Sequence, residues 1–188
     1  MTYLWIAAGY LLISAALYAA MRFKCKRDPV FKAPRSRTLY YLISLTWGLP
    51  AVLTGAIAAL FIRLRGHKPS KYGWEWVFAL PGIDWGLSLG LFIIAPEGEE
   101  KLMAHEHGHG IQNIYLGVFM PAAVLIPSFV RFRYRKIRKK TGKPSKKPYD
   151  YVWFENSATA SGLELAVRLK REEEMKNDPA VSERADYK

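Results

Sequence analysis

The sequence predicts a membrane-anchored α+β protein, and three observations lead to this class. Two long uncharged segments lie in the N-terminal third, at residues 3 to 21 and 39 to 62. A stretch rich in aromatic and β-branched residues follows, with the pattern of strands. A helix-forming segment with three closely spaced histidines comes next. We expect two N-terminal transmembrane helices, then a small domain that combines a β-hairpin with a metal-binding helix.

Apolar and cationic residues are both abundant in this chain. It has 188 residues, 51% of them hydrophobic, and a formal net charge of +12. This length suits one domain with a real core, or a small domain plus a membrane anchor, and is too short for two soluble domains. The lone Cys25 excludes an intrachain disulfide.

The first uncharged segment, residues 3 to 21, has the length of a transmembrane helix. A helix rises 1.5 Å per residue, so this segment covers most of a hydrocarbon layer of ~30 Å. A cleaved signal peptide is the competing interpretation. No basic region precedes the apolar run, and no small-x-small cleavage site follows it. We therefore expect a retained helix.

The second uncharged segment, residues 39 to 62, predicts another transmembrane helix with a kink. Tyr40, Tyr41 and Trp47 are amphipathic aromatic residues of the kind found at headgroup depth. Pro50 removes one helical hydrogen bond and disfavours a helical conformation in the residue before it, which predicts the kink near the middle. Residues 1–64 then form a transmembrane region with a basic loop at 22–38.

The next apolar stretch predicts a β-hairpin and not a third membrane span. Glu75 and Asp84 interrupt it, and the pair Pro81 and Gly82 signals a turn. Aromatic and β-branched residues on both sides predict two strands, near 74 to 80 and 86 to 94. Two glycines in the second arm, at positions 86 and 90, indicate a bulge or a close approach of another backbone.

The histidine cluster contains the motif HExxH. Carboxylates at residues 96 to 101 suit the start of a helix, which would place His105 and His109 on one face, about one turn apart. Two imidazole nitrogens can then bind one Zn²⁺ ion, and Glu106 can take a proton from the attacking water. His107 points away. The alternative is a histidine-rich helix start near lipid headgroups that binds metal adventitiously.

A catalytic zinc site needs a third protein ligand and an open fourth position. Gln112 and Tyr115 stand where the long motif HExxHxxGxxH requires glycine and histidine, so that class is excluded. Glu155 lies among aromatic residues that would bury it, and a buried carboxylate needs a cation. We expect Glu155 to be the third ligand, with Asp150 and Glu164 as alternatives.

These residues resemble those of a known family. HExxH followed by ExxA and a later glycine (Glu155, Ala158, Gly162) resembles the gluzincin metallopeptidases, including the membrane-embedded prenyl-protein proteases. More closely, "SLTWG", "GHKPSKYG", "HEHGHGIQN", "FMPAAVLIPS" and "DYVWFENSAT" together resemble a group of small, uncharacterised bacterial membrane proteins with a predicted zinc-protease motif, over residues 43 to 162.

The resemblance implies a zincin-like domain at residues 65–175 and a multi-pass protein of the bacterial inner membrane. In the membrane-protease pattern an aspartate follows the alanine of ExxA and supports a ligand histidine. This chain has Thr159 there. A hydroxyl can accept the same hydrogen bond but brings no charge.

Residues 111–130 are apolar enough to cross a bilayer, but a crossing would separate His109 from Glu155. Both could not then bind one ion. Two prolines, at positions 121 and 127, interrupt helical continuity. We therefore expect a bent, half-buried segment. A flexible tail is expected at residues 176–188.

A basic run at residues 131 to 147 contains ten Lys and Arg residues. Beside membrane segments, attraction to anionic lipid headgroups explains it more simply than nucleic acid, at about 1 kcal/mol per residue. The basic loop 22–37 and this run both favour the cytoplasmic face, yet two complete crossings would separate them. The count of positive charges leaves the orientation open.

Together these features predict a membrane-associated zinc metallopeptidase that cleaves a peptide or protein substrate. An extended peptide would lie along the second strand of the hairpin, in front of the metal. The alternative is a non-catalytic membrane protein, a lipid-surface or scaffolding module with a structural or vestigial zinc site. The substrate, the membrane face and the oligomeric state are open at this level.

Overall fold

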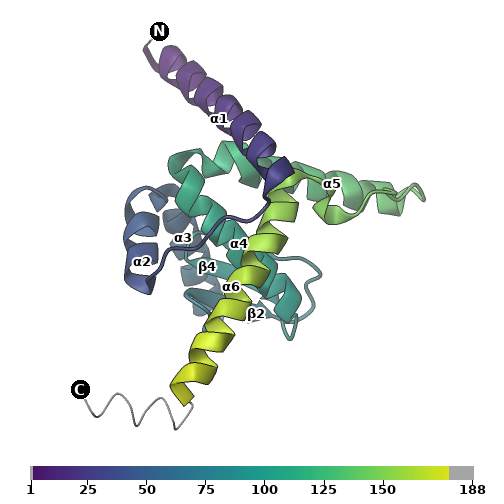
Figure 1. The fold of residues 1–188 in the computed structure, drawn as a ribbon. Helices are drawn as coiled ribbons and strands as arrows, with labels where there is room; N and C mark the ends of the chain where they lie inside the picture. Colours follow the sequence, from purple (N-terminus) through teal and green to yellow (C-terminus); the bar gives the residue numbers. More distant parts are fainter. Residues whose placement is uncertain (1, 178–188) are drawn as a thin grey trace.

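Helix α1 (Thr2–Arg27) stands out from the rest of the molecule and fits a membrane span. The structure is a computed structural model that describes residues 2–177. Within these residues, α1 is the one continuous helix that is long and apolar enough to cross a membrane. Most of its apolar side chains are exposed, among them Leu4, Trp5 and Leu12. The first predicted transmembrane helix therefore has the length and surface that a span requires (Figure 1).

The second predicted transmembrane helix is not a continuous helix. The segment is divided into α2 (Arg37–Thr46) and α3 (Leu49–Leu64), whose axes differ by 95°. Gly48 has a non-helical ψ of 8°, and Pro50 has no N–H to continue the helical ladder. The predicted kink is thus a complete break. Of the two predicted membrane-spanning helices, the structure has one as a continuous helix, because α2 and α3 reach the required length only as a bent pair.

A four-stranded sheet follows the helical region. Its strands are β1 (Ser70–Tyr72), β2 (Glu75–Leu80), β3 (Leu87–Leu89) and β4 (Phe92–Pro96), in the order β1-β2-β4-β3. The predicted two-stranded hairpin is wrong in its pairing, because the second arm turns back on itself at Gly90, where φ is +67°. Strand β4 therefore runs parallel to β2, and β3 lies at the edge.

Helix α4 (Glu100–Leu116) begins within the predicted carboxylate-rich stretch and carries the HExxH motif. Two short segments, η1 (Gly117–Phe119) and η2 (Pro121–Leu125), lead from it into α5 (Ile126–Lys140). The chain bends by 119° there, because Gly117 has a positive φ and Pro121 cannot continue the ladder. Residues 111–130 are thus bent and half-buried, as expected.

Helix α6 (Trp153–Asn177) follows the short segment η3 (Tyr149–Tyr151) and crosses α4 closely (Figure 1). Two glycines allow the contact. A side chain at Gly108 would overlap the carbonyl of Ala158, and one at Gly162 would overlap that of Ala104. Of the predicted tail, residues 178–188 lie outside the described part of the chain.

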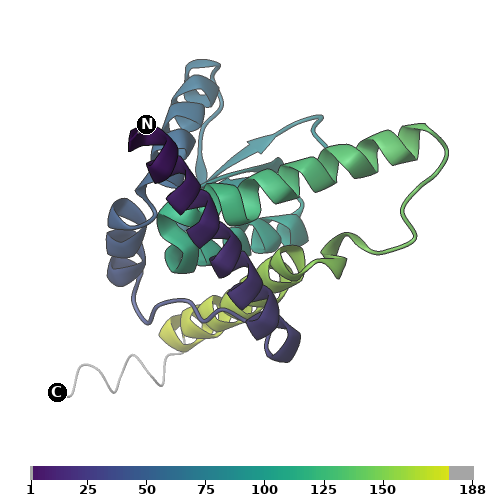
Figure 2. The same cartoon turned by 90° about the horizontal axis from the view of Figure 1, so that it is seen from above.

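The hydrophobic core joins the N-terminal helices to the sheet and to α4 and α6. One cluster of buried side chains draws on all of these parts and includes Cys25, Tyr40, Val52, Trp74, Ile111 and Phe154. Helix α5 extends out from this body, and the loop after it returns to the start of α6 (Figure 2). The loop thereby places Glu155, in the first turn of α6, beside α4.

The contact between α4 and α6 predicts a strong effect of a single methyl group at Gly162. Gly162→Ala should lower the free energy of unfolding by about 1–3 kcal/mol, because the added carbon presses on the Ala104 carbonyl. Denaturant unfolding in detergent, followed by circular dichroism, measures the change. Gly9→Ala in α1 is the matched control, since nothing lies within 4 Å of the added carbon. Equal effects at both positions would contradict the packing argument.

Candidate metal centre

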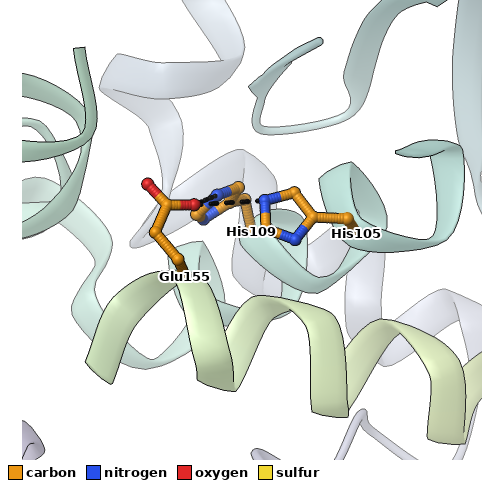
Figure 3. Close-up of side chains that lie close together, drawn as sticks. All are labelled: His105, His109 and Glu155. Atoms are coloured by element: carbon orange, nitrogen blue, oxygen red, sulfur yellow. Dashed lines mark ion pairs between the residues drawn. The ribbon is translucent and has the colours of Figure 1, made fainter. Parts of the chain in front are cut away.

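Two helices bring three potential metal ligands to one point. His105 and His109 project from the same face of α4, and Glu155 projects from α6 (Figure 3). Glu155 Oε2 lies 3.2 Å from His105 Nε2 and 3.4 Å from His109 Nε2. The three ligand atoms lie within 4.8 Å of one another. The residues predicted as ligands therefore form a group that could hold a metal ion.

Glu155 is fully buried, and its two oxygens have different surroundings. The Ser128 hydroxyl donates to Oε1 at 2.6 Å, whereas Oε2 faces the two imidazoles. Burial acts to raise the pKa of Glu155, but the imidazoles and the Ser128 hydroxyl outweigh it, so this pKa lies below its ordinary value. The carboxylate stays ionised and needs a positive charge near Oε2.

The hydrogen bonds of Gln112 determine which nitrogen of His109 carries the proton. The amide nitrogen of Gln112 donates to the Phe154 carbonyl at 2.7 Å and also to Ser157 Oγ. Its oxygen therefore faces His109 Nδ1, at 2.8 Å, and an amide oxygen can only accept. His109 Nδ1 must donate, so in the neutral form of the ring the Nε2 atom that faces Glu155 carries the lone pair. A cation suits this arrangement.

His105 has a comparable contact on its other nitrogen. His105 Nδ1 lies 2.8 Å from the hydroxyl of Thr159. Thr159 occupies the position of the supporting aspartate in the membrane-protease pattern, and it reaches the ligand histidine without adding charge. The same contact orients the ring so that Nε2 faces Glu155.

Glu106, the predicted base, is buried next to the ligands and against the edge strand. Its carboxylate packs so closely on Gly86 that a side chain there would overlap it, and it lies within hydrogen-bonding reach of the Ser88 backbone. A small cavity joins Glu106 to the imidazoles, and its polar lining includes Ser88, His105, Glu106, His109, Ser128 and Tyr149.

The other residues considered from the sequence lie away from this group. His107 is buried on the opposite face of α4, near Gly73 and the rings of Tyr40 and Tyr72. Asp150 and Glu164, the alternative ligands, are exposed and are not part of the group.

Sequence reasoning missed two residues that line the site, Ser128 and Tyr149. Burial, with the nearby Glu155 carboxylate, raises the pKa of Tyr149 to about 12, so its hydroxyl keeps its proton at neutral pH. The ring of Tyr149 lies 6.3 Å from that of His105. Ser128 ends the segment "FMPAAVLIPS", for which the sequence predicted no role at the site, and Tyr149 lies outside the quoted segments. The 119° bend before α5 is what brings Ser128 to the site.

A larger cleft of about 1170 Å³ opens onto the same residues. His105 and Glu106 line it, together with β3 and the first two turns of α5. Its apolar wall consists of Trp85, Leu87, Leu89, Leu102, Leu125, Ile126, Phe129 and Phe132. The candidate metal centre is therefore accessible from outside the protein.

No family model, curated protein or solved structure matches this chain. The functional interpretation therefore depends on the geometry of the site itself. Two imidazoles and one carboxylate converge there, and an acid and a phenol line the adjoining cavity.

The hydroxyl of Thr159 should contribute to metal affinity through His105. Thr159→Val keeps the shape of the side chain but removes the hydrogen bond to Nδ1, and the affinity for added zinc should fall about 10–100-fold. Competition with a chromophoric chelator measures it. Thr159→Ser retains the hydroxyl and should bind zinc nearly as well as the unaltered protein. Equal affinities for the valine and serine variants would contradict this role.

Proposed function

We propose that the protein is a membrane-anchored, zinc-dependent metallopeptidase that hydrolyses peptide bonds. The observation that carries the proposal is the convergence of two imidazole nitrogens and one buried carboxylate oxygen on a single point. Two histidines and an acid, with a position left open, are a ligand set of catalytic zinc sites. We assign His105, His109 and Glu155 as the zinc ligands.

Zinc in such a site polarises a carbonyl group and lowers the pKa of water. Glu106 is the general base in this proposal. Its carboxylate lines the cavity beside the ligands, so it can accept a proton from the water that attacks the peptide carbonyl. The C–N bond then breaks, and Glu106 passes the proton to the leaving amine. The neutral Tyr149 hydroxyl lines the same cavity and is suited to donate a hydrogen bond to the carbonyl oxygen.

The position of strand β3 at the edge of the sheet favours a peptide as the substrate. This strand pairs with β4 on one side, and Leu87 and Leu89 line the cleft. An extended peptide could add to this edge through backbone hydrogen bonds and so pass beside Glu106. The sequence predicts this role for residues 86–94. Because β4 lies inside the sheet, the proposal now places the peptide along Leu87–Leu89.

The proposal includes the membrane as a partner. Helix α1 supplies the anchor, and the cationic residues of α5 and the following loop suit anionic lipid headgroups. A multi-pass arrangement in the bacterial inner membrane belongs to the same proposal; it would require at least one of the two bent helix pairs to cross the bilayer.

Zinc content tests the proposed ligands directly. The double variant His105→Ala, His109→Ala should lose stoichiometric zinc, because one carboxylate alone does not hold the ion. Elemental analysis of the purified full chain in detergent measures it. His67→Ala, which removes the histidine between α3 and β1, is the control and should keep its zinc. A double variant that retained one zinc per chain would refute the assignment.

Glu106→Gln separates the base from the ligands. This variant should keep its zinc, yet kcat for a peptide substrate should fall about 10²–10⁴-fold because the amide cannot accept the proton. Peptide cleavage followed by mass spectrometry, on preparations of equal zinc content, measures it. Undiminished turnover by Glu106→Gln would show that Glu106 is not the general base. Zinc binding without any cleavage by the unaltered protein would favour a structural zinc site instead.

A further inference from the structure

If α1 crosses the bilayer, its contacts with other elements indicate how deep those elements lie in the bilayer. The hydroxyl of Tyr10 donates to the carbonyl of Val118 at 2.9 Å, and its ring stacks on Phe119 at 5.3 Å. Tyr10 lies near the middle of the uncharged segment at residues 3 to 21. The bend between α4 and α5 therefore lies nearly level with the middle of this uncharged segment.

The metal centre lies closer to the C-terminal end of α1. The ring of Tyr18 lies 5.3 Å from that of Trp153 and 6.4 Å from that of Phe154, the residue before Glu155. Tyr18 is eight residues beyond Tyr10, or about 12 Å along the helix axis, and only about 6 Å before Arg22. Glu155 is thus level with a point about one turn inside the first charged residue of α1.

The start of the first basic segment and the end of the second lie near this same end of α1. Lys24, Lys26 and Arg27 lie in its last turn. Tyr151, just beyond the second basic run, lies within electrostatic reach of Arg22, and its ring is 3.9 Å from Lys147 Nζ. The bends in the chain let both basic segments approach one membrane face, which the sequence could not reconcile with two complete crossings.

Helix α5 has the surface of a helix that lies in a membrane interface. Large apolar side chains are exposed along it at helical spacing, at Ile126, Phe129, Val130, Tyr134 and Ile137. Most of the cationic residues occupy its other faces, Arg133 lies within the apolar face one turn after Phe129, and the last turn of the helix is basic. A helix of this kind rests with its apolar side at the boundary between headgroups and acyl chains.

The cleft continues directly into this exposed apolar surface. Ile126 and Phe129 line the cleft, and each is also more than half exposed. Arg133 and Lys136, farther along α5, also line the cleft, but its wall is mainly apolar. A polypeptide segment could therefore pass from the hydrocarbon boundary into the cleft along a mainly apolar surface.

We propose that the metal centre lies at the boundary between hydrocarbon and headgroups, and that its substrate is an extended, largely apolar polypeptide segment of another membrane protein, just outside its transmembrane helix. The segment enters the cleft beside α5 and pairs with β3. The substrate assignment rests on the proposed peptidase function. The placement in the bilayer rests on the contacts of α1 and the surface of α5, and does not depend on that function.

Spin-label depth measurements on the full chain in vesicles of phosphatidylcholine and phosphatidylglycerol test the placement. In a Cys25→Ala background, single cysteines at Leu4, Leu12 and Ala20 calibrate the depth along α1. A label at Phe129 should collide more with oxygen than with a nickel chelate, and a label at Tyr151 should match that at Ala20. Labels at Phe129 and Tyr151 that are as accessible to the nickel chelate as one at Glu173 would overturn the placement.

Two fusion substrates in the same vesicles test the substrate class. Both carry one apolar target sequence after a transmembrane helix, joined by a spacer of about 5 or about 30 flexible residues, the longer reaching about 30 Å from the bilayer. The short fusion should be cleaved roughly tenfold faster, because only its target lies at the level of the site. Phe129→Asn should reduce this preference, whereas Leu60→Asn, on the exposed face of α3, should not.

The outcomes separate this inference from the proposed function. Equal cleavage of both fusions would overturn the substrate class and leave the peptidase intact. Cleavage that persisted in Glu106→Gln would overturn the proposed mechanism. Loss of cleavage for both fusions, with zinc bound, would overturn the substrate class together with the peptidase, and the depth measurements would still decide the placement.

Discussion

A buried negative charge is the constraint on which the rest of the site depends. Glu155 is fully inside the protein, and an unpaired carboxylate there would be very costly. Its Oε2 atom faces two imidazole nitrogens, and the contact of His109 Nδ1 with Gln112 means that Nε2 carries the lone pair when this ring is neutral. A cation at this point would relieve the charge of the carboxylate and use the lone pair of the imidazole.

Close helix packing makes this convergence possible. Because side chains at Gly108 and Gly162 would overlap α6 and α4 respectively, the two helices approach more closely there than ordinary side chains allow. The side chains of His105 and Glu155 are short, so a larger distance between α4 and α6 would move their ligand atoms apart. Close packing thus explains Gly162, the glycine that follows the ExxA pattern. Gly108 allows the matching contact from α4 to α6.

Local patterns predicted the site better than they predicted the sheet. Two histidines one helical turn apart share a face in any α-helix, and an acid among aromatic residues must be buried beside a cation, so His105, His109 and Glu155 could be found from the sequence. Strand pairing depends on contacts between residues distant in the chain. The parallel pairing of β2 with β4 therefore could not be predicted from the sequence. In the sequence, Gln112 served only to exclude the motif HExxHxxGxxH, and its hydrogen bond to His109 was not predicted.

The arrangement of the basic segments follows from where the chain bends. A count of positive charges treats each apolar segment as a straight crossing, and two such crossings place the two basic segments on opposite faces. Bends of 95° and 119° remove that assumption, since a bent pair can enter and return on one side. The contact between the rings of Tyr18 and Trp153 places Glu155 near the C-terminal part of α1. Tyr151, just after the second basic run, lies within electrostatic reach of Arg22 on the same helix. The contacts of α1 set the level of the metal centre along that helix, so the proposed depth of the centre depends on how α1 crosses the bilayer.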